Sequence, residues 1–252
     1  MIKFTSNIQK GGALLDDARR VVEVWDLAAD AATNLSRIAE ENLLAKPSRA
    51  RAEDVLKRVL RPRLVEPGPH VIAALKELIR LPRSFTEAYY FEATRDDELL
   101  AAFAEGPLFA WWQQGRLAID VSLVTTWLGQ LIHEGNAPEW TDTVRTKVAR
   151  GLLAALRDFG VLTGADRKEF AQPSLSIGGF GYVAYRLHES GASSRALLAS
   201  PVWHRWLLDQ GRVTEMFHEA ARKGLLRYSS AGSSVRVDWL QESLPEVVRA
   251  VA

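Results

Sequence analysis

The chain has 252 residues, of which 47% are hydrophobic and 25% are charged, and its formal net charge is +1 at pH 7. This is an ordinary globular composition, with enough apolar residues to bury one substantial core or two smaller ones. Cysteine is absent, which excludes disulfides, thiolate catalysis and cysteine-based metal sites. Because the net charge is so small, any affinity for nucleic acid must come from local clusters of cations.

The N-terminal stretch and the hydropathy pattern predict a soluble, cytoplasmic protein. Asp16 and Asp17 precede any long apolar run, so we expect neither a signal peptide nor a transit peptide. The most apolar region, residues 117–132, is interrupted by Asp120 and other polar residues and falls short of a membrane span. We therefore expect no contact with a membrane.

After a helix predicted over residues 13–25, residues 33–63 are typical of a helix-turn-helix. Two segments with apolar stripes at helical spacing flank the corner Ala45-Lys46-Pro47-Ser48. The proline disfavours helical geometry at the preceding lysine, and the serine hydroxyl can accept a backbone N–H of the following helix. The second helix is expected to end at Arg61-Pro62-Arg63 and Glu66-Pro67-Gly68-Pro69.

The outward face of this second helix is basic, with only Glu53 and Asp54 against five cations. Those cations are Arg49, Arg51, Lys57, Arg58 and Arg61. A helix that is held by its apolar stripe and carries cations on the opposite face fits the recognition helix of a DNA-binding helix-turn-helix. The alternative interpretation is the ordinary solvated face of a helical domain.

The pattern of residues 68–136 predicts a helical middle region. The helix-breaking residues Glu66-Pro67-Gly68-Pro69 mark its beginning. Helices are expected over residues 70–80, 84–94, 96–104 and 121–133. Ser84 and Glu87 have the spacing of a capping box, and Gly106-Pro107 is expected to end the third helix. The aromatic cluster at residues 109–112 is interpreted as core, because Lys and Arg are missing around it.

Residues 137–252 predict a winged-helix-like region. A helix from Thr141 to Phe159, ended by Gly160, is followed by two short apolar segments that can pair as a hairpin around residues 165–167. The same order returns at residues 213–223, Gly224 and a hairpin formed by residues 225–228 and 235–237. Two copies of this order favour winged-helix-like units, although the order also occurs in proteins that bind nothing. The candidate cations of these units are Arg145, Lys147, Arg150 and Arg157 on the first helix and Arg227 and Arg236 on the last hairpin.

No pattern in the sequence supports catalysis, a metal site or a cofactor. The five histidines are scattered, and the paired acids at residues 40–41 and 96–98 lie where acids favour the helix dipole. The glycine run at residues 178–181 lacks the partner residues of a phosphate-binding loop and is interpreted as a loop before a helix over residues 182–189. We therefore predict a non-enzymatic protein without cofactor or metal.

Two long runs resemble the BrxA family of the BREX bacteriophage-exclusion systems. These are NIQKGGALLDDARRVVEVWD at residues 7–26 and NLSRIAEENLLAKPSRARAEDVLKRVL at residues 34–60, and the similarity continues through FEATRDDELLAAFAEGPLFAWW and TVRTKVARGLLAALRDFGVL. The resemblance implies a small, mostly helical, cytoplasmic accessory protein that binds double-stranded DNA and works beside a separate methyltransferase. It supplies no catalytic residues, and it implies DNA contacts at the basic positions of residues 49–61 and 145–157.

We thus expect a mainly α, compact multi-helix protein that carries small β-hairpins. Its expected regions are an N-terminal helix-turn-helix (residues 1–67), a helical middle (68–136) and a C-terminal winged-helix-like part (137–252). The leading hypothesis is a monomeric, double-stranded DNA-binding component of a phage-defence system. One alternative is an adaptor that docks other BREX proteins without touching DNA, and another is RNA binding, since helical bundles with basic faces also bind structured RNA.

Overall fold

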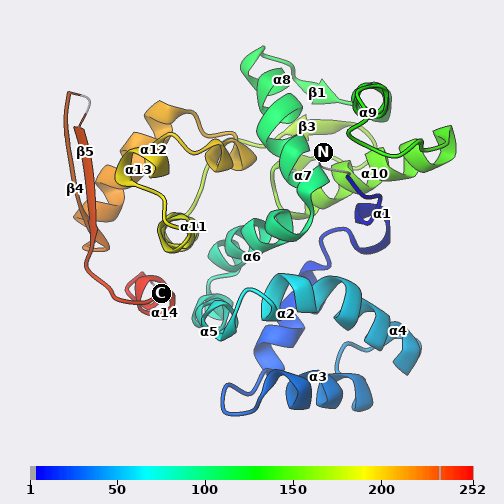
Figure 1. Ribbon diagram of the computed structural model, residues 1–252, viewed down its shortest axis with the longest axis horizontal. Coiled ribbons are helices and arrows are strands. Elements are labelled where there is room, and N and C mark those ends of the chain that lie inside the picture. Colours follow the sequence, from blue (N-terminus) through cyan, green and yellow to red (C-terminus); the bar gives the residue numbers. More distant parts are fainter. Residues whose placement is uncertain (1–3, 233, 252) are drawn as a thin grey trace. The chain divides into compact units, whose positions relative to one another are not determined.

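The computed structural model describes residues 4–232 and 234–251, and it confirms a mainly α fold with two small antiparallel sheets (Figure 1). Contacts group the chain into two compact units, each assembled from segments that are distant in sequence. Unit 1 comprises the described residues up to Ala13, Ala93–Ser174 and Pro201–Asp209, and unit 2 comprises Leu14–Glu92, Leu175–Ser200 and the described residues from Gln210 on. The three contiguous regions expected from the sequence stay a prediction, and the contacts divide the chain differently.

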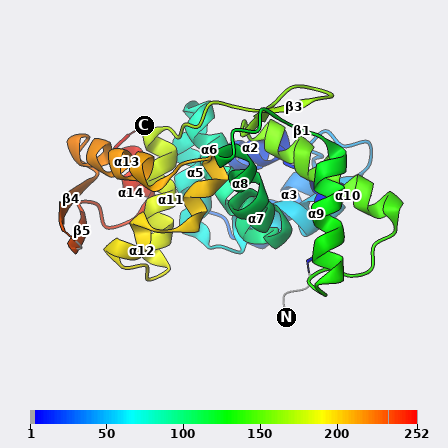
Figure 2. The same ribbon diagram turned by 90° about the horizontal axis from the view of Figure 1, so that it is seen from above.

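Unit 1 holds a three-stranded sheet and seven helical elements, besides the last residues of α6. The helical elements are α1 (Ile8–Gly11), α7 (Glu98–Phe103), the π-helix η3 (Ala104–Leu108), α8 (Phe109–Gln113), α9 (Val121–His133), α10 (Asp142–Asp158) and the 3₁₀-helix η4 (Pro201–Trp206). The strands are β1 (Ala118–Ile119), β2 (Leu162–Thr163) and β3 (Lys168–Phe170). Figures 1 and 2 show β3 beside β1, and the order across the sheet is β1-β3-β2.

The order along unit 1 from residue 118 is strand, helix, helix, strand, strand. Glu169 of the central strand β3 lies opposite Ala118 of β1 on one side and opposite Thr163 of β2 on the other. The hairpin predicted at residues 161–171 is therefore confirmed. The short strand β1 was not predicted, because two residues are too few to show an alternating pattern.

Local signals in the sequence fix the ends of α9 and α10. The Asp120 carboxylate accepts the N–H of Leu123, a hydrogen bond that lowers the pKa of Asp120 and caps α9. The Thr141 hydroxyl accepts the N–H of Val144 at 3.4 Å, and Gly160 ends α10 with a φ of 78°, which glycine adopts without strain. The predicted cap and stop of this helix are both confirmed.

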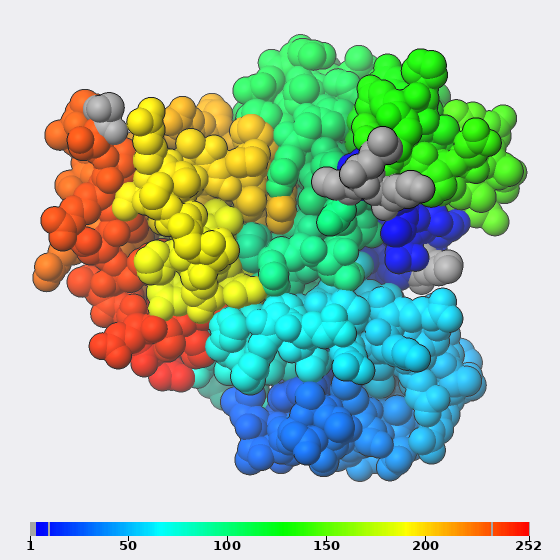
Figure 3. Space-filling view, in the orientation of Figure 1, coloured from blue at the N-terminus to red at the C-terminus, as the bar shows by residue number. Residues whose placement is uncertain are grey.

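Unit 2 contains the N-terminal helices and the C-terminal hairpin. Its helical elements are α2 (Leu15–Val24), α3 (Ala31–Glu40), α4 (Arg49–Val55), the π-helix η1 (Leu56–Val65), α5 (Pro69–Glu77), the 3₁₀-helix η2 (Leu78–Arg80), α6 (Pro82–Asp96), α11 (Ile177–Glu189), α12 (Ser194–Leu198), α13 (Gln210–Arg222) and α14 (Leu244–Arg249). Its strands are β4 (Leu226–Ala231) and β5 (Ser234–Trp239). In the space-filling view of Figure 3, α3 and α4 form adjoining blue surfaces at the bottom of the face shown.

Of the two stops predicted for the second N-terminal helix, the one at Arg61-Pro62-Arg63 was wrong, and the one at Glu66-Pro67-Gly68-Pro69 is confirmed. α4 continues directly into η1, which contains Pro62 and runs to Val65. Pro107 lies inside η3 in the same way, so the stop predicted at Gly106-Pro107 was also wrong. A proline ring clashes with the carbonyl four residues back in an α-helix, whereas the wider π turn bonds to the fifth residue and leaves room for the ring.

The C-terminal hairpin is confirmed, with Tyr228 opposite Val237 in β5. Gly224, at a φ of 73°, follows α13 as predicted. Tyr228 stacks against Phe217 of α13 at 5.5 Å between ring centroids, which fixes the face that the hairpin turns toward the unit. Of the turn predicted at Ala231-Gly232, Ala231 is the last residue of β4, and Gly232 lies in the turn with a φ of 57°. Residue 233 lies outside the described residues.

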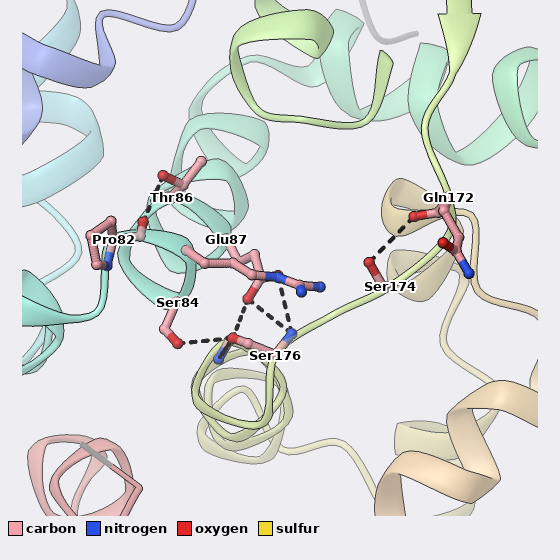
Figure 4. Close-up of polar contacts among 9 residues, drawn as sticks. Pro82, Ser84, Thr86, Glu87, Gln172, Ser174 and Ser176 are labelled. Atoms are coloured by element: carbon pink, nitrogen blue, oxygen red, sulfur yellow. Dashed lines mark hydrogen bonds and ion pairs between the residues drawn. The ribbon is translucent and has the colours of Figure 1, made fainter. Parts of the chain in front are cut away.

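The capping box predicted for Ser84 and Glu87 acts on a different helix (Figure 4). α6 begins at Pro82, so both residues lie inside it. The Glu87 carboxylate instead accepts the backbone N–H of Ser176 at 3.0 Å, and Ser176 is the N-cap of α11. The Ser176 hydroxyl accepts the N–H of Gly179 at 3.0 Å. Glu87 thus does from another helix what a glutamate at the third position of α11 would do in an ordinary capping box.

This arrangement explains the glycine run, which is the first turn of α11 and not the predicted loop. A Cβ at Gly178 would lie 2.7 Å from the Ser84 hydroxyl, and a Cβ at Gly179 would lie 2.8 Å from the Cβ of Glu87. The two glycines therefore let α6 approach the end of α11 closely enough to cap it.

We expect Gly179→Ala to lower the free energy of unfolding by about 1–3 kcal/mol, the usual cost of forcing a methyl into a packed site. The added methyl group must displace the Glu87 carboxylate, which breaks the cap. Urea unfolding followed by circular dichroism measures the change. Gly106→Ala is the control, because a Cβ there has open space; equal effects at the two positions would contradict the close approach.

Candidate nucleic-acid interface

Three of the predicted cations lie on one exposed stripe of α10. Lys147, Arg150 and Arg157 recur at helical spacing on the solvent face, opposite the buried stripe that includes Val148 and Leu152. Arg157 is paired with Asp158 at 2.7 Å. Within the described residues, Lys147 and Arg150 have no ion pair, so their charges are available to an anion.

Arg145 is not on this stripe. Its Nη1 lies 3.1 Å from the position that a Cβ would take at Gly129, so the guanidinium packs over that glycine of α9. It also pairs with Asp142 in the first turn of the helix. Only 31% of the Arg145 side chain is exposed, because it packs between α10 and α9.

The turn between β2 and β3 is held from inside by a lysine. Lys168 is buried, and its ammonium donates to the carbonyl of Gly164 at 2.8 Å and to that of Ala165. Gly164 has a φ of 87°, and a Cβ there would overlap the carbonyl of Arg167. The side chain of Arg167, which was not predicted as a site residue, is 72% exposed at this turn and lies 3.9 Å from the carboxylate of Glu169. This turn therefore carries an exposed arginine with an exposed acid beside it.

The five cations predicted on the second N-terminal helix divide into two sets. Arg51 and Arg58 both pair with Asp54, at 2.9 and 2.6 Å, so one carboxylate serves two guanidinium groups. The other three face α3 across a groove, which is lined by Leu35, Ser36, Ala39, Arg49, Glu53, Leu56, Lys57 and Arg61 and has a volume of about 280 Å³. The predicted basic face therefore consists of an outer row, Arg51 and Arg58, which is paired with Asp54, and a cationic groove rim, Arg49, Lys57 and Arg61.

The helix-turn-helix corner itself has the predicted cap. The Ser48 hydroxyl accepts the N–H of Arg51 at 3.2 Å and starts α4. Asn42 closes the corner, because its side chain bonds both the N–H and the carbonyl of Lys46. The Lys46 ammonium in turn pairs with Asp17 at 2.7 Å.

The two cations of the last hairpin share a face with an acid. Arg227 lies opposite Asp238 in the register, and Arg236 pairs with the same aspartate at 2.7 Å. Both arginines are exposed. The aspartate offsets half of their charge, which leaves this hairpin less cationic than the α10 stripe.

Over residues 4–232 and 234–251, no group of three or more His, Asp or Glu side chains could hold a metal ion. In the same ranges, the helices are too short or too polar to cross a membrane.

Comparisons with known proteins found a matching family model and similarity to a solved structure. The crystal structure of an uncharacterized protein from Magnetospirillum magneticum is similar, with a TM-score of 0.61 and 19% identity over 81% of this chain and 98% of that chain. At that identity, the likeness shows the fold alone. No curated protein matches the chain. The model of the BrxA family matches residues 2–184, which is well over half of the sequence, so the chain belongs to the BrxA family, a component of BREX phage-defence systems.

Proposed function

We propose that the protein binds double-stranded DNA through unit 1, as a winged helix-turn-helix in which α10 is the recognition helix and the β2–β3 turn is the wing. The order strand, helix, helix, strand, strand and the sheet order β1-β3-β2 support this assignment. The observation that carries the proposal is the α10 stripe of Lys147, Arg150 and Arg157.

The charges on this stripe suit phosphate binding. Lys147 and Arg150 have no intramolecular ion pair among the described residues, so contact with a phosphate does not first require a salt bridge to break. Each phosphate that is neutralised releases condensed counterions, and this release drives binding even when the net charge of the protein is close to zero.

Duplex DNA fits an exposed helix better than duplex RNA does. The major groove of B-DNA is about 12 Å wide and admits a helix, whereas the major groove of A-form RNA is deep and narrow. The proposed recognition by α10 therefore favours DNA over the RNA-binding alternative.

The test is the fluorescence anisotropy of a labelled random-sequence DNA duplex, titrated with the full chain over a salt series. Three phosphate contacts predict a slope of log affinity against log salt of about −2.7 or steeper, at about 0.9 per contact. Unlabelled duplex RNA is expected to compete poorly. Absence of binding at low salt would refute the proposal.

A further inference from the structure

The groove between α3 and the continuous helix α4–η1 combines an apolar floor with a cationic rim. Leu35, Ala39 and Leu56 provide the floor. Its volume of about 280 Å³ is just below the range of about 300–1,000 Å³ that is usual for small-molecule sites, and it suits one or two large apolar side chains. Grooves of this kind between helices receive the apolar face of an amphipathic helix.

The rim is formed by Arg49, Lys57 and Arg61. Arg49 lies 2.7 Å from Glu53 and 3.7 Å from Glu40, and Arg61 lies 3.4 Å from Glu66. Both arginine side chains are more than half exposed, so water screens these pairs and a carboxylate from a partner can replace them. Lys57 has no ion pair in the part of the chain that the structure describes.

We propose that this groove docks an acidic amphipathic peptide segment of a partner protein. Apolar side chains of the segment fill the floor, and its carboxylates approach Lys57 and Arg61. Glu53 lines the groove beside Arg49 and repels acids there, which places the acidic side of the segment at the other end of the rim.

DNA fits this groove less well than such a peptide. A phosphate backbone has no apolar group that would fill a floor of leucine and alanine side chains. The groove lies wholly in unit 2, whereas the α10 stripe lies in unit 1. The docking proposal therefore does not depend on the proposed DNA binding.

The experiment uses the full chain and a fluorescein-labelled peptide of about 18 residues, long enough to form a helix, with leucines along one face and glutamates on the others. We expect saturable binding in an anisotropy titration. A second peptide with alanine in place of each leucine keeps the charge and is expected to bind at least tenfold more weakly. Equal binding of the two peptides, or no binding of the leucine peptide, would overturn the proposal.

Two variants locate the binding. Ser36→Trp places an indole in the groove without changing charge, and Lys57→Glu/Arg61→Glu reverses the rim; each should weaken peptide binding at least tenfold. Thr33→Trp, at an exposed position of α3 that is turned away from the face of Leu35, Ser36 and Ala39, is the matched control and should bind like the wild type. The rim variant, which alters only exposed residues, keeps the test valid if Ser36→Trp does not fold.

The same proteins are titrated with the DNA duplex. If Ser36→Trp loses DNA affinity and keeps peptide affinity, the groove belongs to DNA and the docking proposal is wrong. Loss of peptide binding with DNA binding unchanged supports it. Failure of the DNA proposal shows instead in the wild type, as absence of DNA binding at low salt.

Discussion

Lys147→Glu/Arg150→Glu is expected to lower the affinity for duplex DNA by at least about 100-fold at low salt, because two phosphate contacts become two repulsions. The milder change Lys147→Ala/Arg150→Ala should reduce the salt slope by about 1.8, at about 0.9 for each lost contact. Anisotropy titrations over the salt series measure both effects. Both residues are exposed and unpaired within the described residues, so the helical circular dichroism spectrum should not change.

Two further variants make this prediction specific. Arg222→Glu/Lys223→Glu changes the net charge equally at exposed residues of unit 2 and should bind DNA almost as the wild type does. Arg51→Glu/Arg58→Glu tests the outer row of the N-terminal helix pair, where Asp54 already offsets part of the charge, so a smaller loss is expected. A larger loss there than on α10 would move the DNA-binding face to the N-terminal pair.

Glu92→Ala is expected to lower the free energy of unfolding by about 3–5 kcal/mol, the usual cost of removing one partner of a buried ion pair. The Glu92 side chain is fully buried and accepts from the Tyr182 hydroxyl at 2.8 Å and from Nε of Arg186 at 2.9 Å. Burial lowers the pKa of the Arg186 guanidinium, but the charge and hydrogen bond of Glu92, together with the hydrogen bond to Glu189, outweigh burial and raise that pKa above its usual value. Arg186 therefore stays charged and loses its buried partner.

Urea unfolding compares this variant with Glu92→Leu/Tyr182→Phe/Arg186→Leu, which replaces the polar cluster by apolar side chains. The triple variant should recover part of the lost stability, because the Glu92, Tyr182 and Arg186 groups that bond to one another are all replaced together. In Glu92→Ala, Arg186 still has its ion pair with Glu189, at 2.8 Å. Because this pair remains, we expect the loss of unfolding free energy to lie toward the lower end of the range of about 3–5 kcal/mol. A loss below about 1 kcal/mol would show that water reaches the cluster.

The sequence by itself determined the elements whose signals act within a few residues. The caps at Ser48 and Thr141, the stops at Gly160 and Gly224, and both hairpins were predicted and are present. Side-chain caps, left-handed glycines and alternating strands each depend on backbone groups no more than a few positions away. The family resemblance, carried by long runs, was confirmed in the same way by a match over residues 2–184.

Only the tertiary structure decided features that depend on atoms distant in sequence. Pro62 and Pro107 did not end their helices, because π turns hold them inside longer packed segments. Glu87 caps α11 from α6, a pairing that spacing along one helix cannot reveal. The predicted cations were all visible in the sequence, but their surroundings were not. Only the structure shows that Lys147 and Arg150 share an exposed stripe and that Arg145 packs over Gly129. Only the structure divides the cations of the N-terminal face into an outer row and a groove rim. Electrostatic availability depends on which acids and helices fold against a cation, and that is a property of the packed chain.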